Sequence, residues 1–232
     1  MYDLIVIGAG PGGYEAAAYA AKLGKKVALC EKNELGGTCL NVGCIPTKTL
    51  LRSAKAFEDC QEAKLYGVHG AAQASLDLAA VQARKKSVVD TLIKGVTGML
   101  KRAGVDVIKA EAKLVAPGKV SADGKIYEAA NILVATGSVP AVPPIPGLRD
   151  NPQVLDSTGI LNLDTVPESL VIIGAGVIGL EFASFFATVG SKVTVVEMLP
   201  KIAPVVDEEI AKGLMTALKK LGVTFNLSCK VT

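Results

Sequence analysis

The sequence contains no tryptophan, and aromatic residues make up only 4% of its 232 residues. Surfaces that bind single-stranded nucleic acids stack bases on aromatic side chains, so this scarcity argues against such a platform. Charge is also nearly balanced, with 25 lysines and arginines against 22 aspartates and glutamates. Because the basic residues are scattered along the chain, we expect neither a nucleic-acid partner nor a membrane-surface partner.

Histidine is almost absent, since His69 is the single one and lies in a polar stretch. A structural zinc ion needs four cysteine or histidine ligands at short spacings. Three of the five cysteines, Cys30, Cys60 and Cys229, are far from one another in the sequence. We therefore expect no metal site.

The sequence also lacks the features of a leader peptide or a membrane span. An apolar run begins at Leu4 with no basic segment before it, so no signal peptide is expected. Residues 169–190 contain no lysine or arginine, but Glu181 and the spaced glycines argue against a transmembrane helix. We expect a cytoplasmic protein in a reducing compartment, where a catalytic disulfide is more usual than a structural one.

What the sequence does contain is a duplicated unit. Each copy has an apolar run, the motif G-x-G-x-x-G, an apolar helix-like segment and a second apolar run that ends on an acidic residue. This order predicts two βαβ units, and hence an α/β fold with two Rossmann-like dinucleotide-binding domains. The recurring residues are Gly8, Gly10, Gly13 and Glu31 in the first copy and Gly174, Gly176, Gly179 and Glu197 in the second.

Each glycine of the motif has its own predicted role. The first makes a tight turn, the second lets a pyrophosphate approach the backbone, and the third lets helix and strand pack closely. The pyrophosphate would lie at the helix N-terminus, where N–H groups and the helix dipole favour negative charge. Glu31 and Glu197 suit hydrogen bonds to a ribose 2′-hydroxyl and would repel a 2′-phosphate, so the nicotinamide cofactor is expected to be NAD rather than NADP.

The remaining segments give a coarse domain plan. A proline-rich stretch at 139–147 marks a boundary between a first domain, 1–147, and a second domain, 148–232. Hydrophobic periodicity and turn residues predict the other elements. These are helices at 45–66, 75–103 and 207–221, strands at 105–110, 132–135 and 223–231, and a β-hairpin of 113–120 with 125–128.

The stretch GGTCLNVGCIPTK places Cys39 and Cys44 five positions apart. In a regular helix such residues are about 8 Å apart, whereas the Cα atoms of a disulfide lie roughly 4.4–6.8 Å apart. A disulfide therefore needs an irregular backbone, which Gly43 and Pro46 could supply. A following helix and Lys48 would lower the thiol pKa. The alternatives for these residues are a redox-active disulfide, two inert thiols and a zinc site, and the zinc site lacks the further ligands that it would need.

Taken together, the first unit, the cysteine motif, the segment ATGS and the second unit closely resemble the pyridine nucleotide–disulfide oxidoreductases. The opening YDLIVIGAGPGGY and the ending IPTK favour the members that oxidise dihydrolipoamide with NAD+. The resemblance covers essentially the whole chain. It implies an FAD flavoprotein that acts as a homodimer on dihydrolipoamide carried by a lipoyl protein or domain. Members that reduce mercuric ion carry a similar motif and are the alternative.

The resemblance also implies roles for single residues. Cys44 would form the charge-transfer thiolate beside the flavin, and Cys39 would exchange with the substrate. Glu181 would reach toward the flavin and pair with Lys48. Contacts with FAD would come from Gly8, Gly10, Gly13, Glu31, Lys32, Gly36, Gly37, Thr38, Cys39, Lys48, Ala112 (often glycine in the family), Ala135, Thr136 and Gly137. Contacts with NAD would come from Gly174, Gly176, Val177, Ile178, Gly179, Glu181, Glu197 and Val231.

Two parts of the family pattern have no match in the sequence. One is a histidine–glutamate pair in a C-terminal interface domain, and the other is a later segment that completes the flavin domain. We therefore expect the chain to be a C-terminally truncated piece whose NAD domain is incomplete. Such a piece would not turn over alone, so a nucleotide-binding fragment without activity is the second alternative.

Overall fold

The structure is a computed structural model that describes all 232 residues. The chain divides into two compact units, Met1–Pro46 with Lys86–Val139 and Thr47–Lys85 with Pro140–Thr232. Residues 47–85, placed in the first domain by the sequence, thus belong to the second unit. The boundary at residue 147 stays a prediction. No helix of the chain combines the length and apolarity needed to cross a membrane.

The first unit is built on a six-stranded mixed sheet with the order β3-β2-β1-β6-β5-β4. Its central strands are parallel: Ile5 of β1 lies opposite Ala28 of β2 on one side and Ile132 of β6 on the other. This arrangement confirms the predicted α/β class. The strands are β1 (Tyr2–Ile7), β2 (Val27–Cys30), β3 (Asp106–Ile108), β4 (Lys113–Ala116), β5 (Lys119–Ala122) and β6 (Lys125–Val134).

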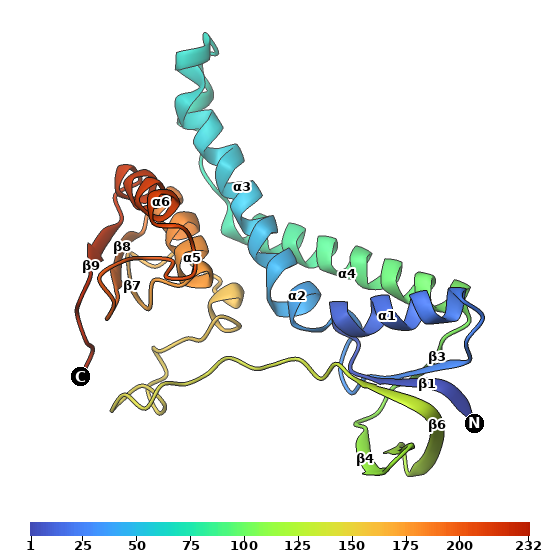
Figure 1. The fold of residues 1–232 in the computed structure, drawn as a ribbon. Helices are drawn as coiled ribbons and strands as arrows, with labels where there is room; N and C mark the ends of the chain where they lie inside the picture. The colour runs from blue at the N-terminus through green and yellow to red at the C-terminus, as the bar shows by residue number, and fades with distance from the viewer. The chain divides into compact units, whose positions relative to one another are not determined.

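Helix α1 (Pro11–Lys22) and the C-terminal part of α4 (Leu78–Ala103) pack together beside this sheet (Figure 1). Alanines such as Ala17 keep α1 close to the strands, and Leu29 and Leu100 are fully buried in the same cluster. Each buried leucine stabilises the fold by roughly 1.5–3 kcal/mol. The packing fixes the loop between β1 and α1.

The antiparallel part of the sheet differs from the predicted hairpin. The expected strand 113–120 is two strands, because the chain turns at Gly118, where φ is +71°. The expected strands 125–128 and 132–135 are one strand, β6, because its first half pairs with β5 and its second half with β1. The sequence prediction was wrong in these two details.

The predicted helices are found with shifted ends. Helix α3 (Cys44–Glu62) passes into the 3₁₀ turn η1 (Ala63–Tyr66), and the turn η2 (Ala71–Gln73) follows. Helix α4 starts after Asp77, whose carboxylate accepts a hydrogen bond from the Ala80 N–H group at 3.1 Å. A side chain that caps the first turn in this way explains the later start.

The second unit contains a three-stranded parallel sheet with the order β7-β8-β9. Phe185 and Phe186 lie buried beneath it, edge to face at 5.0 Å between ring centroids. The side chain of Asp207 caps α6 by accepting from the Glu209 N–H group at 2.9 Å. The elements are η3 (Ile160–Asn162), β7 (Ser169–Ile173), α5 (Val177–Thr188), β8 (Lys192–Val196), α6 (Glu208–Lys220) and β9 (Thr224–Asn226).

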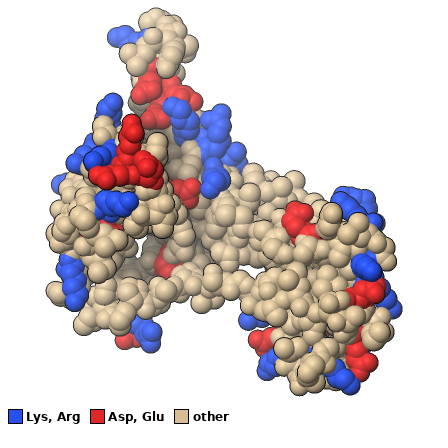
Figure 2. Space-filling model, in the orientation of Figure 1, with Lys and Arg blue, Asp and Glu red and all other residues tan.

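Two predicted strands are shorter than expected. Strand β3 covers only the centre of 105–110, and β9 covers only the first part of 223–231. Ser228 has a φ of +54°, a conformation that does not continue a strand. On the face shown in Figure 2, acidic and basic side chains are interspersed.

Candidate functional site

The first glycine-rich loop leaves no room for side chains at two of its glycines. Gly8 has a φ of +101°, and a Cβ atom there would lie 2.3 Å from the Ala135 carbonyl oxygen. A Cβ atom on Gly13 would lie 1.8 Å from the Gly8 carbonyl oxygen. Glycine is therefore required at both positions by the fold itself, at the turn and where helix α1 meets strand β1.

The middle glycine is different. Gly10 precedes α1 with an ordinary extended φ of −70°, and a Cβ atom there would have its nearest neighbour, Gly37 Cα, at 3.9 Å. In the second loop Gly176 also has an ordinary φ of −73°, and no atom lies within 4 Å of its Cβ position. Neither glycine is required by the protein's own packing. Each leaves an open backbone surface at a helix N-terminus, which fits a pyrophosphate.

The second glycine-rich loop repeats the positive φ and the close backbone approach that are found in the first loop. Gly174 has a φ of +98°, and a Cβ atom on Gly179 would lie 2.7 Å from the Gly174 carbonyl oxygen. Val177 and Ile178, in the first turn of α5, each expose 54% of their surface. The two halves of the chain thus build the same local structure from the same motif.

The acidic residues at the ends of β2 and β8 take identical places in the two copies. The Glu31 carboxylate accepts from the N–H groups of Ala9 and Asn33, both at 2.8 Å. The Glu197 carboxylate accepts from the N–H groups of Ala175 and Leu199, both at 2.7 Å. Hydrogen bonds to a carboxylate are the strong ones. Each acid therefore braces its glycine loop, a role that the sequence analysis missed although both acids stand at the same spacing.

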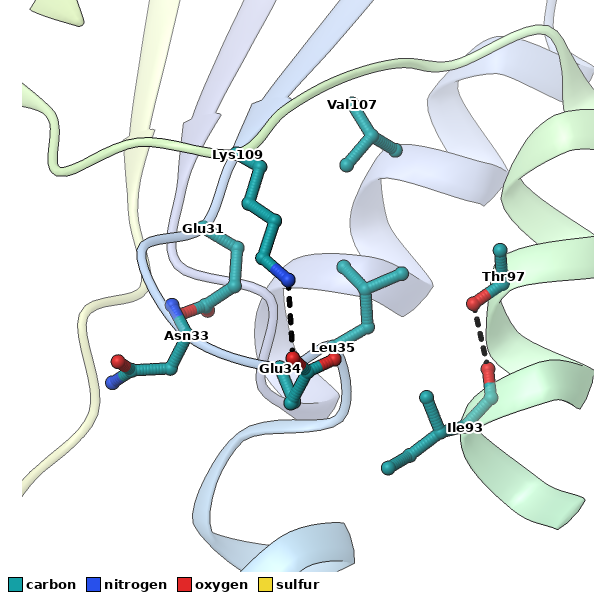
Figure 3. Close-up of a pocket in the computed structure, with 8 residues that line it drawn as sticks. All are labelled: Glu31, Asn33, Glu34, Leu35, Ile93, Thr97, Val107 and Lys109. Atoms are coloured by element: carbon teal, nitrogen blue, oxygen red, sulfur yellow. Dashed lines mark hydrogen bonds and ion pairs between the residues drawn. The ribbon is translucent and has the colours of Figure 1, made fainter. Parts of the chain in front are cut away.

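A pocket of about 130 Å³ lies beside Glu31 in the first unit. In Figure 3 the Lys109 side chain reaches across it to Glu34, and Nζ lies 3.1 Å from Oε1. A second surface pair, Lys32 with Glu111, has its charged atoms 3.7 Å apart. The sequence singled out only Glu31 among the lining residues, which are Glu31, Asn33, Glu34, Leu35, Ile93, Thr97, Val107 and Lys109.

The cysteine motif forms two helices with a break between them. Helix α2 (Gly37–Val42) carries Cys39, and α3 begins at Cys44. A Cβ atom on Gly43 would lie 2.8 Å from the Thr38 carbonyl oxygen and 3.3 Å from Cys39 Cα. Gly43 has non-helical dihedrals, with φ −140° and ψ −114°, so the backbone is irregular there, as a disulfide over this spacing requires. Pro46 instead lies inside the first turn of α3. Cys39 is half-buried and Cys44 is exposed; their disulfide stays a prediction.

The cysteine motif also lies directly against the first glycine loop. The Gly36 N–H group donates to the Ala9 carbonyl oxygen at 2.8 Å. A Cβ atom on Gly37 would lie 2.5 Å from Gly10 Cα. Two loops with separate predicted roles, one for a dinucleotide and one for thiol chemistry, are thus in backbone contact.

Lys48 and Glu181 form an ion pair within the second unit, with 3.2 Å between Nζ and Oε1. Lys48 lies one turn after Cys44 in α3, and Glu181 lies in the second turn of α5. The resemblance implied this pair, and the structure contains it. The roles of the two residues in catalysis stay predictions.

The remaining expected contacts are spread over both units. The Ala135 N–H group donates to the Ile7 carbonyl oxygen at 2.8 Å, which holds the ATG segment beside Gly8, and Gly137 has a φ of +71°. Thr38 is exposed, while Ala112 and Val231 are half-buried. Nowhere in the chain do three or more histidine, cysteine, aspartate or glutamate side chains gather as a metal ion would require.

Two βαβ units with open glycine loops, one of them in contact with a cysteine motif, define a dinucleotide-binding protein with a candidate redox centre. The family model for pyridine nucleotide-disulphide oxidoreductases matches residues 2–232. The chain therefore belongs to that family, and the resemblance inferred from the sequence is confirmed.

Individual relatives agree with this assignment. The chain is 46% identical to a dihydrolipoyl dehydrogenase of Trypanosoma brucei brucei, over 95% of this chain and 47% of that protein. It is 41% identical to the dihydrolipoyl dehydrogenase of Bacillus subtilis (strain 168), over 99% of this chain and 51% of that protein. Among solved structures, the HOCl-induced flavoprotein disulfide reductase RclA from Escherichia coli is similar with a TM-score of 0.85. That match has 36% identity and covers 99% of this chain and 49% of that one. The chain thus spans about half the length of these relatives.

Proposed function

We propose that the chain is the dinucleotide-binding part of a flavin-dependent disulfide oxidoreductase that oxidises dihydrolipoamide to lipoamide with NAD+. The observation that carries this proposal is the backbone contact between the cysteine motif and the first glycine loop, at Gly37 and Gly10. It brings a pair of cysteines to the place where the first dinucleotide would bind. The relatives named dihydrolipoyl dehydrogenase favour lipoamide as the substrate.

The residues of the first unit fit FAD. Gly10 offers an open backbone surface for the pyrophosphate, and Glu31, which lines the pocket of Figure 3, would accept a hydrogen bond from the adenosine ribose. The resemblance adds Lys32, Gly36, Gly37, Thr38, Cys39, Lys48, Ala112, Ala135, Thr136 and Gly137 as further contacts. Bound FAD would supply the two-electron chemistry that joins the cysteine pair to NAD+.

The residues of the second unit fit NAD. Gly176 leaves its backbone open, and Glu197 would accept hydrogen bonds from a ribose. Met198, next to Glu197, is 68% exposed and offers no charge to a 2′-phosphate. Val177, Ile178, Gly179 and Val231 would complete the site. NAD rather than NADP is therefore the proposed nicotinamide cofactor.

The cysteines would carry the thiol chemistry. A thiolate of dihydrolipoamide attacks the sulfur of Cys39, which breaks the Cys39–Cys44 bond and releases the Cys44 thiolate. The second substrate thiol then displaces Cys39, so that lipoamide leaves with a new S–S bond and two cysteine thiols remain. Lys48 lies one turn after Cys44 in α3 and would act there with Glu181, its ion-pair partner. We also propose a homodimer that acts on a lipoyl carrier protein in the cytoplasm.

An anaerobic visible spectrum, recorded while NADH is added, tests the proposal. We expect a flavin spectrum that develops a long-wavelength thiolate–flavin band in the wild type and in the control Cys60→Ser. The band should be absent from Cys44→Ser, which should still bind flavin. A colourless wild type would contradict FAD binding by these residues, and a band that persists in Cys44→Ser would contradict the role of Cys44.

Turnover by the chain alone is a separate question. We propose that the 232 residues bind nucleotides but do not turn over, because they cover about half the length of their relatives. An NADH–lipoamide assay on a sample whose intact mass matches the 232 residues decides this point. Measurable lipoamide reduction by that sample would show that the remaining half of the relatives is not required.

A further inference from the structure

We propose that Asn41 is a positioning residue for the Cys39–Cys44 pair, because its side-chain amide holds helix α2 where the disulfide forms. This inference rests on the proposed redox function of the pair. Asn41 lies between the two cysteines in the sequence, and its side chain is half-buried. It has no role in the sequence-based interpretation.

The amide of Asn41 makes two hydrogen bonds to backbone carbonyl groups. Nδ2 donates to the Gly37 oxygen at 2.9 Å and to the Leu35 oxygen at 3.1 Å. Carbonyl oxygens only accept, and the amide nitrogen carries two N–H groups. Both donors are therefore used, and the orientation of the amide is fixed by its partners.

The bond to Leu35 joins helix α2 to the loop that enters it, and the bond to Gly37 lies within the helix. The Gly37 carbonyl lies in the first turn of α2, and the Leu35 carbonyl lies before the helix. Gly36, the residue that precedes the helix, makes no side-chain cap. A helix of six residues is not stable by itself, so side-chain bonds of this kind determine where α2 lies.

The start of the same short helix is held by a backbone hydrogen bond, and the residue that ends it lies close to Cys39. At its start, the Gly36 N–H group donates to the Ala9 carbonyl oxygen at 2.8 Å. At its end, Gly43 comes so close to Cys39 that a Cβ atom added to this glycine would lie 3.3 Å from Cys39 Cα. Because a disulfide accepts only a narrow range of Cα separations, a small displacement of α2 changes how readily Cys39 and Cys44 meet.

Asn41→Asp tests this role with almost no change in shape. It replaces the donating NH₂ group with a carboxylate oxygen, which faces two carbonyl oxygens and is repelled by them. We expect the equilibrium constant for formation of the Cys39–Cys44 disulfide to fall about tenfold, which raises the potential of this two-electron couple by about 30 mV.

The measurement is a titration of the purified protein in anaerobic dithiothreitol redox buffers, followed by alkylation and mass spectrometry. The reaction converts two cysteine thiols to one S–S bond while oxidised dithiothreitol takes up the two electrons and two protons. Asn131→Asp is the matched control, since Asn131 Nδ2 also donates to a backbone carbonyl, that of Asp3 at 3.2 Å, in the same unit. We expect this control to titrate like the wild type.

Asn41→Ser is a second, milder variant, because its hydroxyl carries a single donor and cannot reach both carbonyls. We expect its equilibrium constant to fall at least threefold, and it decides the matter if circular dichroism shows Asn41→Asp to be unfolded. Folded Asn41 variants that stay within twofold of the wild type would overturn the positioning role alone. A wild type that forms no Cys39–Cys44 disulfide in any buffer would overturn the proposed redox function and, with it, this inference.

Discussion

Lys48 Nζ lies 3.2 Å from Glu181 Oε1, although 133 positions separate the two residues in the sequence. The side chains are 63% and 34% exposed. Exposed ion pairs of this kind stabilise proteins by about 0–1 kcal/mol. Stability alone therefore gives little reason for this pair, whereas the family resemblance implies a role for both residues near the flavin.

Lys48→Met should separate the contribution of Lys48 to stability from its contribution to flavin reduction. We expect the free energy of unfolding to fall by less than about 1 kcal/mol, while the rate at which NADH reduces the bound flavin falls more than tenfold. Urea unfolding and anaerobic stopped-flow absorbance measure the two quantities. The control is Lys55→Met, since Lys55 forms exposed pairs with Glu58 and Asp59 in the same helix. Equal flavin reduction rates in both variants would contradict a role for Lys48 at the flavin.

Two glycines of the first loop, Gly10 and Gly13, should respond differently to alanine. Gly13→Ala puts a Cβ atom 1.8 Å from a backbone oxygen, and we expect destabilisation of about 3 kcal/mol or more. Gly10→Ala meets no such contact, so its stability should change by less than about 1 kcal/mol. Its affinity for FAD should nevertheless fall more than tenfold, because the methyl group occupies the proposed pyrophosphate surface. Thermal unfolding and flavin fluorescence titration check both results; unchanged FAD affinity in Gly10→Ala would contradict the proposed site.

The βαβ units, and with them much of the site, could be predicted because their signals are local. The glycine motif requires positive φ at Gly8 and Gly174, and the apolar runs before it form β1 and β7. The amphipathic pattern of residues 207–221 likewise predicted α6 to within one residue at each end. In each case the residues that determine the structure are neighbours in the sequence.

Other features depend on residues that are distant in the sequence. Strand β6 is continuous because it pairs first with β5 and then with β1, and no residue within 125–134 reveals this change of partner. The bond from Asn41 to Leu35 likewise depends on how the chain enters α2. Periodicity and motif spacing contain no information about such contacts, so the sequence alone could not predict them.

Gly43→Ala should lower both the stability of the protein and the fraction of the Cys39–Cys44 disulfide, whereas an ordinary glycine-to-alanine substitution in a helix should not. Its methyl group would lie 2.8 Å from the Thr38 carbonyl oxygen and 3.3 Å from Cys39 Cα. We expect destabilisation of roughly 1–3 kcal/mol and a smaller fraction of disulfide at a given redox potential. The control is Gly95→Ala in α4, where no atom lies within 4 Å of the Cβ position. That change should be neutral or stabilising by up to about 1 kcal/mol. A Gly43→Ala protein that is as stable as the wild type would contradict the close approach of Gly43 to Thr38 and Cys39.

The cysteines should differ in their reactivity toward alkylating reagents. Cys30 is 1% exposed in an apolar cluster of the first unit that also contains Ile5 and Val120, and burial raises the pKa of its thiol. Because the thiolate is the reactive form, a raised pKa lowers the reactive fraction at any given pH. After reduction, iodoacetamide at about pH 8 should label the exposed Cys44 and Cys229 at least tenfold faster than Cys30. Peptide mass spectrometry follows the labelling of each cysteine. Labelling of Cys30 at the rate of Cys229 would show that the reagent reaches the Cys30 thiol and that this residue is not buried.

The cross-strand pair of Lys119 and Glu128 should give a pH-dependent contribution to stability. Nζ lies 2.8 Å from Oε1, and the hydrogen bond and charge of Lys119 lower the pKa of Glu128 below its ordinary value of 4.5. A carboxyl group whose pKa is lower in the folded state stabilises the protein above the unfolded-state pKa and loses that effect as pH falls through the folded-state pKa. Glu128→Gln should therefore lower the melting temperature by a few degrees at most near pH 7.

This difference between Glu128→Gln and the wild type should shrink as pH falls from 4.5 through the lower folded-state pKa of Glu128, because the carboxyl group of the folded wild type then becomes protonated. It should also shrink at pH 7 in 1 M salt, where the Debye length is about 3 Å. Thermal unfolding followed by circular dichroism at pH 7 and at lower pH, with and without salt, measures both trends. A difference that stays constant or grows in acid would mean that Glu128 acts through its shape in the sheet. The charge on Lys119 would then have no part in the stability of this strand pair.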